Sequence, residues 1–203
     1  MPLQLQGGNG FGKVTQNAGT KIRVLVPPNS AYRTRLSKMV YTAAATEHVL
    51  TVFRSLGTTT ITTAASAGQP DVIVTADPGP AGNGIAAGDL IAVYSAVDGI
   101  TRLYVVSSWA SISRTITFTT NLTVAATAGD RIWDFGVEGD TDPVWGQAQP
   151  TFRGLANATT TYEQTSDPGL IAGNETNEPL LCSSDNATNA GYFEQVSFTL
   201  TTP

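Results

Sequence analysis

Few side chains of this 203-residue chain could take part in acid–base or covalent chemistry. It has thirty threonines but only one histidine, His48, and one cysteine, Cys182. A catalytic histidine needs a nucleophile within hydrogen-bond reach, and the sequence has no GxSxG or other activated-serine pattern for His48 to serve. One histidine and one cysteine are also too few ligands for a zinc site. We therefore expect no enzymatic activity and no cofactor, with His48 a structural histidine and Cys182 a buried thiol.

A cluster of acidic residues is the main candidate for an ion site. Five of them fall within thirteen positions: Asp130, Asp134, Glu138, Asp140 and Asp142. Carboxylates at such density could bind Ca²⁺ or serve as a pair of glycosidase carboxylates. Their spacing does not match an EF-hand loop, and aspartate is common in turns. The sequence leaves open whether this acidic cluster binds an ion.

Aromatic residues offer a second candidate surface. Three tryptophans and two tyrosines could form a platform on which a sugar ring stacks: Trp109, Trp133, Trp145, Tyr162 and Tyr192. A β-sheet protein also uses tryptophan to fill its core. The sequence alone does not decide between these two roles.

The overall composition indicates a surface that is polar without being highly charged. Charged residues make up 13% of the chain, against roughly 25% in ordinary soluble domains. Such a surface suits a protein packed into an assembly and also suits an extracellular module. The opening MPLQLQGGNGFGK has neither a basic n-region nor an apolar h-region, so we expect no secretory signal. No apolar run approaches the roughly 20 residues that span a bilayer, so we expect no membrane partner.

Positive charge is concentrated in the first part of the sequence. Residues 1–54 carry seven bases and one acid, whereas residues 55–203 carry four bases and fifteen acids. This division predicts that the basic end meets an acidic partner surface. The predicted partner-binding residues are Lys13, Lys21, Arg23, Arg33, Arg35 and Lys38. The alternative is that strands from both ends interleave and their charges mix. Nucleic acid is not an expected partner, because the pI is about 4.7 and no aromatics interleave the bases.

Short β-forming runs separated by Gly, Pro, Asn and Asp predict an all-β fold. For Ser30–Leu50, a helix over 31–47 is the rival to two strands joined by the turn AAAT. We favour the strands because of the β-branched content there. The predicted strands are 20–26, 36–42, 47–54, 59–63, 71–75, 89–95, 100–108, 114–119, 130–135, 159–165, 179–184 and 191–201, with a loop over 137–150.

The texture of the chain changes at Gly57 and again at the loop, which predicts an inserted domain. Two segments within it, IAAGDLIAVY (85–94) and VAATAGDRIWDF (124–135), share a Gly-Asp turn followed by an apolar strand. This repeat fits a small closed barrel with similar strands on opposite sides. The strong strand 191–201 is expected to return to the sheet begun by 20–54. The predicted organisation is a flexible arm (1–19), an outer β-domain (20–57 plus 150–203), an inserted small β-barrel (58–137) and a connecting loop (138–149).

Taken in order, RTRLSKMVYTAAATEHVLTVFRSLG, IAAGDLIAVY, DGITRLYVVSS, GDRIWDFG and EPLLCSSDNATNAGYFEQVSFTLT resemble small structural proteins of tailed bacteriophages. More narrowly, the chain is similar to head cement or decoration proteins built on jelly-roll-like β-domains. The resemblance covers most of residues 20–201 and carries over no individual functional residue. It implies a non-enzymatic virion protein, made in the host cytoplasm. Such a protein binds the major capsid protein or other virion proteins, usually as a homo-oligomer such as a dimer or trimer.

Two other functions remain open from the sequence. One is a tail, baseplate or fibre-associated component of the same kind of particle. The other is a carbohydrate-binding or adhesin module, which the expected lack of an export signal disfavours. Oligomeric state, the identity of the partner and head or tail location are not specified by the sequence.

Overall fold

The structure is a computed structural model, and it confirms the predicted all-β fold. It describes residues 5–6, 9–10, 14–16, 22–26, 33–43, 45–79, 84–137, 147–163, 171–172, 178–184 and 191–201. These residues contain strands and turns, and the described part of the chain includes no helix that could span a membrane. The chain divides into two compact units, one made of residues 1–54 and 148–203 and the other of residues 55–147.

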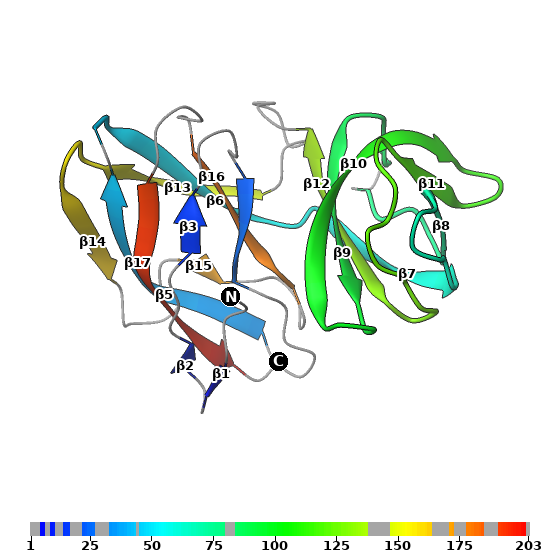
Figure 1. Cartoon of the computed structure of the whole chain (residues 1–203), viewed down its shortest axis with the longest axis horizontal. Helices are drawn as coiled ribbons and strands as arrows, with labels where there is room; N and C mark the ends of the chain where they lie inside the picture. The colour runs from blue at the N-terminus through cyan, green and yellow to red at the C-terminus, as the bar shows by residue number, and fades with distance from the viewer. Residues whose placement is uncertain are drawn as a thin grey trace. The chain divides into compact units, whose positions relative to one another are not determined.

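The first unit is a sandwich of two antiparallel sheets whose strands are paired in a nested order. Strand β5 (Arg33–Ala43) pairs with the last strand, β17 (Gly191–Thr201), and the two lie side by side in Figure 1. Strand β6 (His48–Arg54) pairs in the other sheet with β16 (Leu180–Ser184). The pairing is therefore nested along the chain: β5 pairs with the last strand, and β6, which follows β5, pairs with β16, which precedes β17. This nested order is a jelly-roll-like arrangement.

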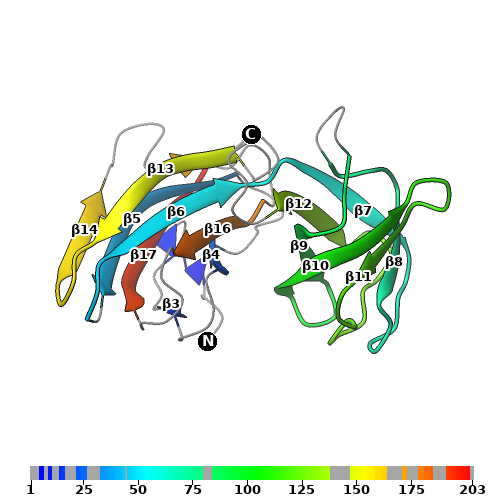
Figure 2. The ribbon, with the colours of Figure 1, turned by 90° about the horizontal axis from the view of Figure 1, so that it is seen from above.

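The remaining strands complete these two sheets, as Figure 2 shows from above. One sheet has the order β13 (Gln147–Gly154), β6, β16 and β4 (Ile22–Val26). The other adds β14 (Thr159–Glu163) and the two-residue β15 (Ile171–Ala172) to β5. It also contains three short strands from the beginning of the chain, which are β1 (Leu5–Gln6), β2 (Asn9–Gly10) and β3 (Val14–Gln16).

The core of the sandwich lies between the facing sides of the two sheets. Alternation along β5 buries Met39, Tyr41 and Ala43, and a register shift against β17 between Lys38 and Leu36 turns Leu36 to the same buried side. A Cβ placed on Gly154 of β13 would lie 2.5 Å from the Tyr41 ring. The opposing sheet therefore packs so closely at this point that only glycine fits.

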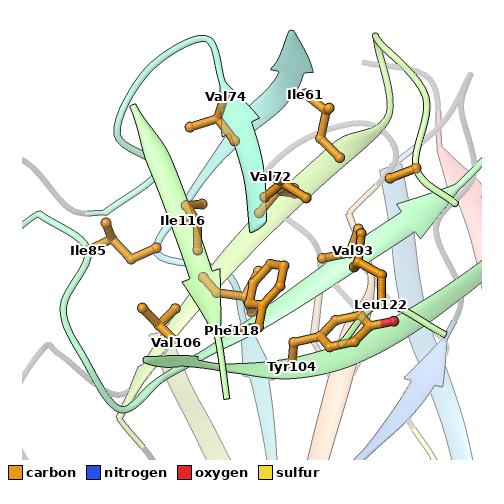
Figure 3. Close-up of a cluster of buried hydrophobic side chains, with 13 residues drawn as sticks. Ile61, Val72, Val74, Ile85, Val93, Tyr104, Val106, Ile116, Phe118 and Leu122 are labelled. Atoms are coloured by element: carbon orange, nitrogen blue, oxygen red, sulfur yellow. The ribbon is translucent and has the colours of Figure 1, made fainter. Parts of the chain in front are cut away.

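The second unit is a closed six-stranded antiparallel barrel. Its strand order is β10 (Ile100–Ala110), β11 (Thr115–Phe118), β8 (Asp71–Val74), β7 (Gly57–Thr63), β12 (Arg131–Val137) and β9 (Asp89–Ser95). Its inward-facing side chains, from all six strands and two connecting loops, form one apolar cluster (Figure 3). Closure leaves the barrel no exposed sheet edge.

The repeated Gly-Asp segments of the sequence form the same turn twice. In each, the aspartate carboxylate accepts a hydrogen bond from the backbone N–H three residues earlier, at 2.6 Å for Asp89 and 2.7 Å for Asp130. The glycine before each aspartate has a positive φ, +97° and +94°. This glycine also donates its N–H to a neighbouring strand in both copies, to the carbonyl of Val106 and of Ile61, at 2.8 Å each. The barrel therefore has an internal pseudo-two-fold repeat.

One detail of the predicted repeat is wrong. The strands that follow the two turns were expected on opposite sides of the barrel, but β9 and β12 are antiparallel neighbours. Because they run in opposite directions, it is their starting turns that lie at opposite ends of the barrel. The pseudo-two-fold axis passes between these two strands.

Two further sequence expectations differ from the structure. Strand β13 begins at Gln147, inside the segment predicted as loop 137–150. The segment predicted as a flexible arm, 1–19, contains β2 and β3, which pair with β17 along the edge opposite β5. The favoured prediction of two strands for Ser30–Leu50 is confirmed by β5 (33–43) and β6 (48–54), so the rival helix over 31–47 is excluded. The predicted loop 138–149 lies outside the described residues up to position 146.

Candidate interaction surface

His48 and Cys182 are both core residues of the sandwich. Nδ1 of His48 lies 2.7 Å from the Tyr41 hydroxyl oxygen, and both side chains are fully buried. Cys182 is buried on β16, opposite Val52 of β6, and is not part of a disulfide. The contact with the Tyr41 hydroxyl explains His48 as a structural histidine of the core.

Asp130 and Asp134 are the two members of the acidic cluster that the structure describes, and each has a different structural setting. Asp130 accepts hydrogen bonds from the backbone N–H groups of Ala96 (3.1 Å) and Thr127 (2.7 Å), so its carboxylate holds two turns together. Asp134 is buried in the barrel wall. Glu138, Asp140 and Asp142 lie outside the described residues, and the described residues contain no group of three metal-ligating side chains.

The aromatic residues that the structure describes do not form a common platform. Trp133 is fully buried, and Trp109 packs against the barrel core. The hydroxyl of Tyr162 is bonded to both backbone groups of Arg153, at 2.8 Å each, while its ring meets Phe152 edge-on. The side chains of Trp145 and Tyr192 are outside the described set.

The predicted basic residues fall on two strands of the sandwich where they are described. Arg23 is on β4, and Arg33, Arg35 and Lys38 are on β5. Nζ of Lys38 lies 3.2 Å from a carboxylate oxygen of Glu163 on β14, so basic and acidic parts of the sequence meet there. Lys13 and Lys21 lie outside the described residues.

Sequence reasoning missed a different feature, which is a set of apolar side chains exposed at the tips of tight turns. We call Val97, Ile112 and Leu155 the turn-tip residues. Val97 is 59% exposed between β9 and β10, and Ile112 is fully exposed between β10 and β11. Leu155 is 50% exposed between β13 and β14 of the sandwich. Single exposed apolar residues are ordinary, so their meaning depends on how the turns are built.

The turn carrying Val97 is fixed by a network of polar contacts. The Val97 N–H donates to the Ser95 hydroxyl oxygen, and the Ser95 hydroxyl donates to the carbonyl of Ala125 at 2.8 Å. Asp98 accepts the N–H of Ile100, and it forms a two-pronged ion pair with Arg102. The Arg102 guanidinium lowers the pKa of the Asp98 carboxyl, so the pair persists over a wide pH range. Ile100, 42% exposed, lies on the same turn.

The turn carrying Ile112 is held just as firmly. The Ser113 hydroxyl lies 2.9 Å from that of Thr115 and is donated to the Ala110 carbonyl at 3.4 Å. Arg114, at a positive φ of +53°, donates its guanidinium to the carbonyl of Thr75 at 2.6 Å, which ties the hairpin to the end of β8. The isoleucine therefore stands on a turn whose conformation is set before any partner is bound.

Val97 and Ile112 lie at opposite ends of strand β10 and Leu155 belongs to the other unit, so each turn tip can act only as a separate contact point. An exposed isoleucine or valine releases about 1.5–3 kcal/mol when it is fully buried, and a rigid loop loses little further entropy on binding. The sequence does show that two turns carry an apolar residue, in the segments Ser-Ile-Ser (111–113) and Ala-Val-Asp (96–98). It does not show that the residue points outward, because that depends on the register of the flanking strands.

No family model and no curated protein matches the chain. Among solved structures it is weakly similar to VP17, a capsid protein of bacteriophage P23-77, with 14% identity and a TM-score of 0.21. That match covers 96% of this chain and 97% of VP17. A similarity this weak does not establish a shared fold or function.

Proposed function

We propose that this chain is a non-enzymatic virion structural protein that binds the outside of a bacteriophage capsid and stabilises it, as cement and decoration proteins do. The observation that supports the proposal is the set of turn-tip residues, which are apolar side chains exposed on tight turns of a weakly charged all-β scaffold. The resemblance of the sequence to phage head proteins agrees with it. The proposed partner is the major capsid protein or another virion protein.

The energetics fit attachment to a repeated lattice. A single turn-tip residue offers only about 1.5–3 kcal/mol of apolar burial, before the loss of translational and rotational freedom is subtracted. Contacts of this size suffice when one oligomer binds several equivalent lattice positions at once, since linked contacts raise the effective concentration. We therefore also propose that the protein acts as a dimer or trimer.

The basic residues have a secondary part in this proposal. Arg23, Arg33 and Arg35 would steer the approach to an acidic capsid surface, and exposed charges change association rates more than final affinity. Attachment is then expected to slow as salt rises from low to physiological concentration, and to change little beyond that, because exposed pairs are already screened.

The first test is to locate the chain. Quantitative mass spectrometry of purified particles of the encoding virus should find it in many copies per particle. Cryo-electron microscopy of those particles should place it on the head surface. Density at the tail or fibre would favour the alternative virion role, and absence from the particles would refute a virion function.

The second test uses rebinding to particles stripped of the protein. Ile112→Ser removes the most exposed turn-tip residue and is expected to weaken rebinding about tenfold, a loss of about 1.4 kcal/mol. Ile73→Ser is the matched control, because Ile73 is 39% exposed on the barrel wall and not at a turn tip. Equal weakening by both variants would refute the role of the turn tips. A glycan array tests the carbohydrate-binding alternative.

A further inference from the structure

One end of the barrel gathers buried carboxyl groups. Asp134, on β12, is fully buried, and Asp89, at the start of β9, is 3% exposed. Oδ1 of Asp134 accepts the N–H of Gly136 at 2.9 Å, whereas Oδ2 has no hydrogen-bond partner among the described residues. A buried carboxylate oxygen without a partner is costly when it is charged and much less so when it carries a proton.

Asp77 and Asp89 hold a loop in place at this end of the barrel. Oδ1 of Asp77 accepts the N–H groups of Gly79 (2.8 Å) and Ile85 (2.9 Å). Asp89 accepts the N–H of Ala86 at 2.6 Å. The side chain of Ile85 is part of the barrel core cluster. The described parts of this loop, 75–79 and 84–88, are therefore fastened to the barrel by two acids and one apolar residue.

The loop lies directly against the strand pair that contains Asp134. Gly57 of β7 is the pairing partner of Asp134, and a Cβ on Gly57 would lie only 2.1 Å from the carbonyl oxygen of Pro78. The described part of the loop backbone therefore passes beside the strand pair at the barrel end where Asp134 is buried. A change in the charge of Asp134 acts on the residues that hold the loop.

The charges that act on Asp134 from the packed elements have the same sign. β9 contributes Asp89, the loop contributes Asp77, and β7 contributes the uncharged Gly57 and Thr58. Burial raises the pKa of Asp134 to about 7, with smaller contributions in the same direction from Asp89 and Asp77. The Gly136 and Phe135 N–H groups act in the opposite direction. Burial also raises the pKa of Asp89.

We propose that Asp134, Asp77 and Asp89 form a proton-controlled latch at the end of the barrel. With a proton on Asp134, the other two carboxylates keep their backbone hydrogen bonds and the loop stays closed over the core. When Asp134 loses the proton, a third negative charge is buried beside them and the loop detaches more often. The latch thus makes the closure of this end depend on pH near neutrality.

The direction of the effect follows from linkage. The pKa of Asp134 is raised in the closed state above its ordinary value of 3.8. Its contribution to closure is therefore fully present below pH 4 and is lost as pH rises through about 7. Release of one proton across that range reduces the closed-to-open ratio about tenfold between about pH 6 and pH 8.

Amide hydrogen exchange of the full chain tests the latch. After correction for intrinsic exchange, protection of the Ile85 and Ala86 N–H groups is expected to fall about tenfold between about pH 6 and pH 8. The internal control is the Gly68 N–H, bonded at 2.8 Å to the Leu122 carbonyl, since the 64–70 loop lies at the other end of β7. Its protection should stay constant. A flat profile at Ile85 and Ala86, or an equal fall at Gly68, would overturn the proposal.

A variant separates Asp134 from other titrating groups. Asp134→Asn keeps the size of the side chain and removes the titration, so the pH dependence at Ile85 and Ala86 should disappear while their protection stays high. An unchanged pH dependence in Asp134→Asn would overturn the assignment. If this variant does not fold, the comparison of the two barrel ends in the wild-type chain still decides the question.

Discussion

Alanine substitution of the two turn aspartates should have unequal effects, although the turns look alike. Asp130 satisfies two backbone donors, the N–H groups of Ala96 and Thr127, and it is buried. Asp130→Ala leaves both donors without an acceptor in a place that water reaches poorly. Each such donor costs roughly 1–3 kcal/mol, so we expect the barrel to lose roughly 2–5 kcal/mol of unfolding free energy.

Asp89 satisfies only one donor, the N–H of Ala86, and burial beside Asp77 raises its pKa. Asp89→Ala therefore removes one hydrogen bond and, at neutral pH, also removes a charge that the surroundings disfavour. These two effects oppose each other, and we expect a net loss of roughly 0–2 kcal/mol. Asp130→Ala should thus be the more destabilising variant by roughly 2 kcal/mol.

Urea unfolding followed by tryptophan fluorescence measures this difference, because all three tryptophans fall within residues 55–147, the barrel unit. The control is Asp130→Asn. Its side chain has one oxygen, which can accept one of the two N–H groups, so this variant should lose about half as much stability as Asp130→Ala. Equal losses for Asp89→Ala and Asp130→Ala would refute the hydrogen-bond reasoning. So would a larger loss for Asp89→Ala.

Other predictions concern the independence of the barrel and the two cores. A fragment of residues 55–147 should show the circular dichroism of a folded β-protein with a cooperative thermal transition, and a random-coil spectrum would contradict this. Ile116→Ala, in the barrel core, should cost roughly 2–5 kcal/mol in urea unfolding, whereas Ile112→Ala should change stability by less than about 0.5 kcal/mol. Tyr41→Phe removes the hydroxyl bonded to His48 and should cost roughly 1–2 kcal/mol, without a change in the far-ultraviolet spectrum.

The positions of most strands could be predicted because each is short, apolar in alternation and bounded by turn-forming residues. The Gly-Asp repeat was equally visible, since a glycine at positive φ followed by an aspartate that caps its own turn is a local pattern. β9, for example, has the predicted bounds 89–95. Information of this kind is contained in neighbouring residues and needs no knowledge of the fold.

What could not be predicted depends on pairing between distant segments. β13 begins in a stretch containing Gln147 and Pro150, which has weak strand propensity, and it becomes a strand because β6 offers it an edge. The Lys38–Glu163 ion pair depends on β5 and β14 being neighbours. The outward direction of Ile112 depends likewise on the register of its hairpin.

The pseudo-two-fold repeat shows why Asp134 stands apart from the rest of the barrel. Counting on from the two turn aspartates, Ile91 corresponds to Ile132, and Val93 corresponds to Asp134. The pairing agrees, because Ile132 lies opposite Val93 and Asp134 lies opposite Ile91. Where one half of the barrel has a core valine, the other half has a buried carboxyl group.

A valine at position 134 would match the repeat and avoid the burial of an acid, which on a pKa of about 7 costs up to roughly 4 kcal/mol at high pH. Asp134 does have one local role, since it accepts the N–H of Gly136 where the pairing of β12 with β9 shifts register. A single hydrogen bond contributes roughly 0.5–1.5 kcal/mol, which is less than the cost of the buried charge at high pH, so the position opposes local stability. Departures of this kind are expected where a protein uses a residue for something other than folding. For Asp134, that use is the response to protons at the end of the barrel that the loop closes.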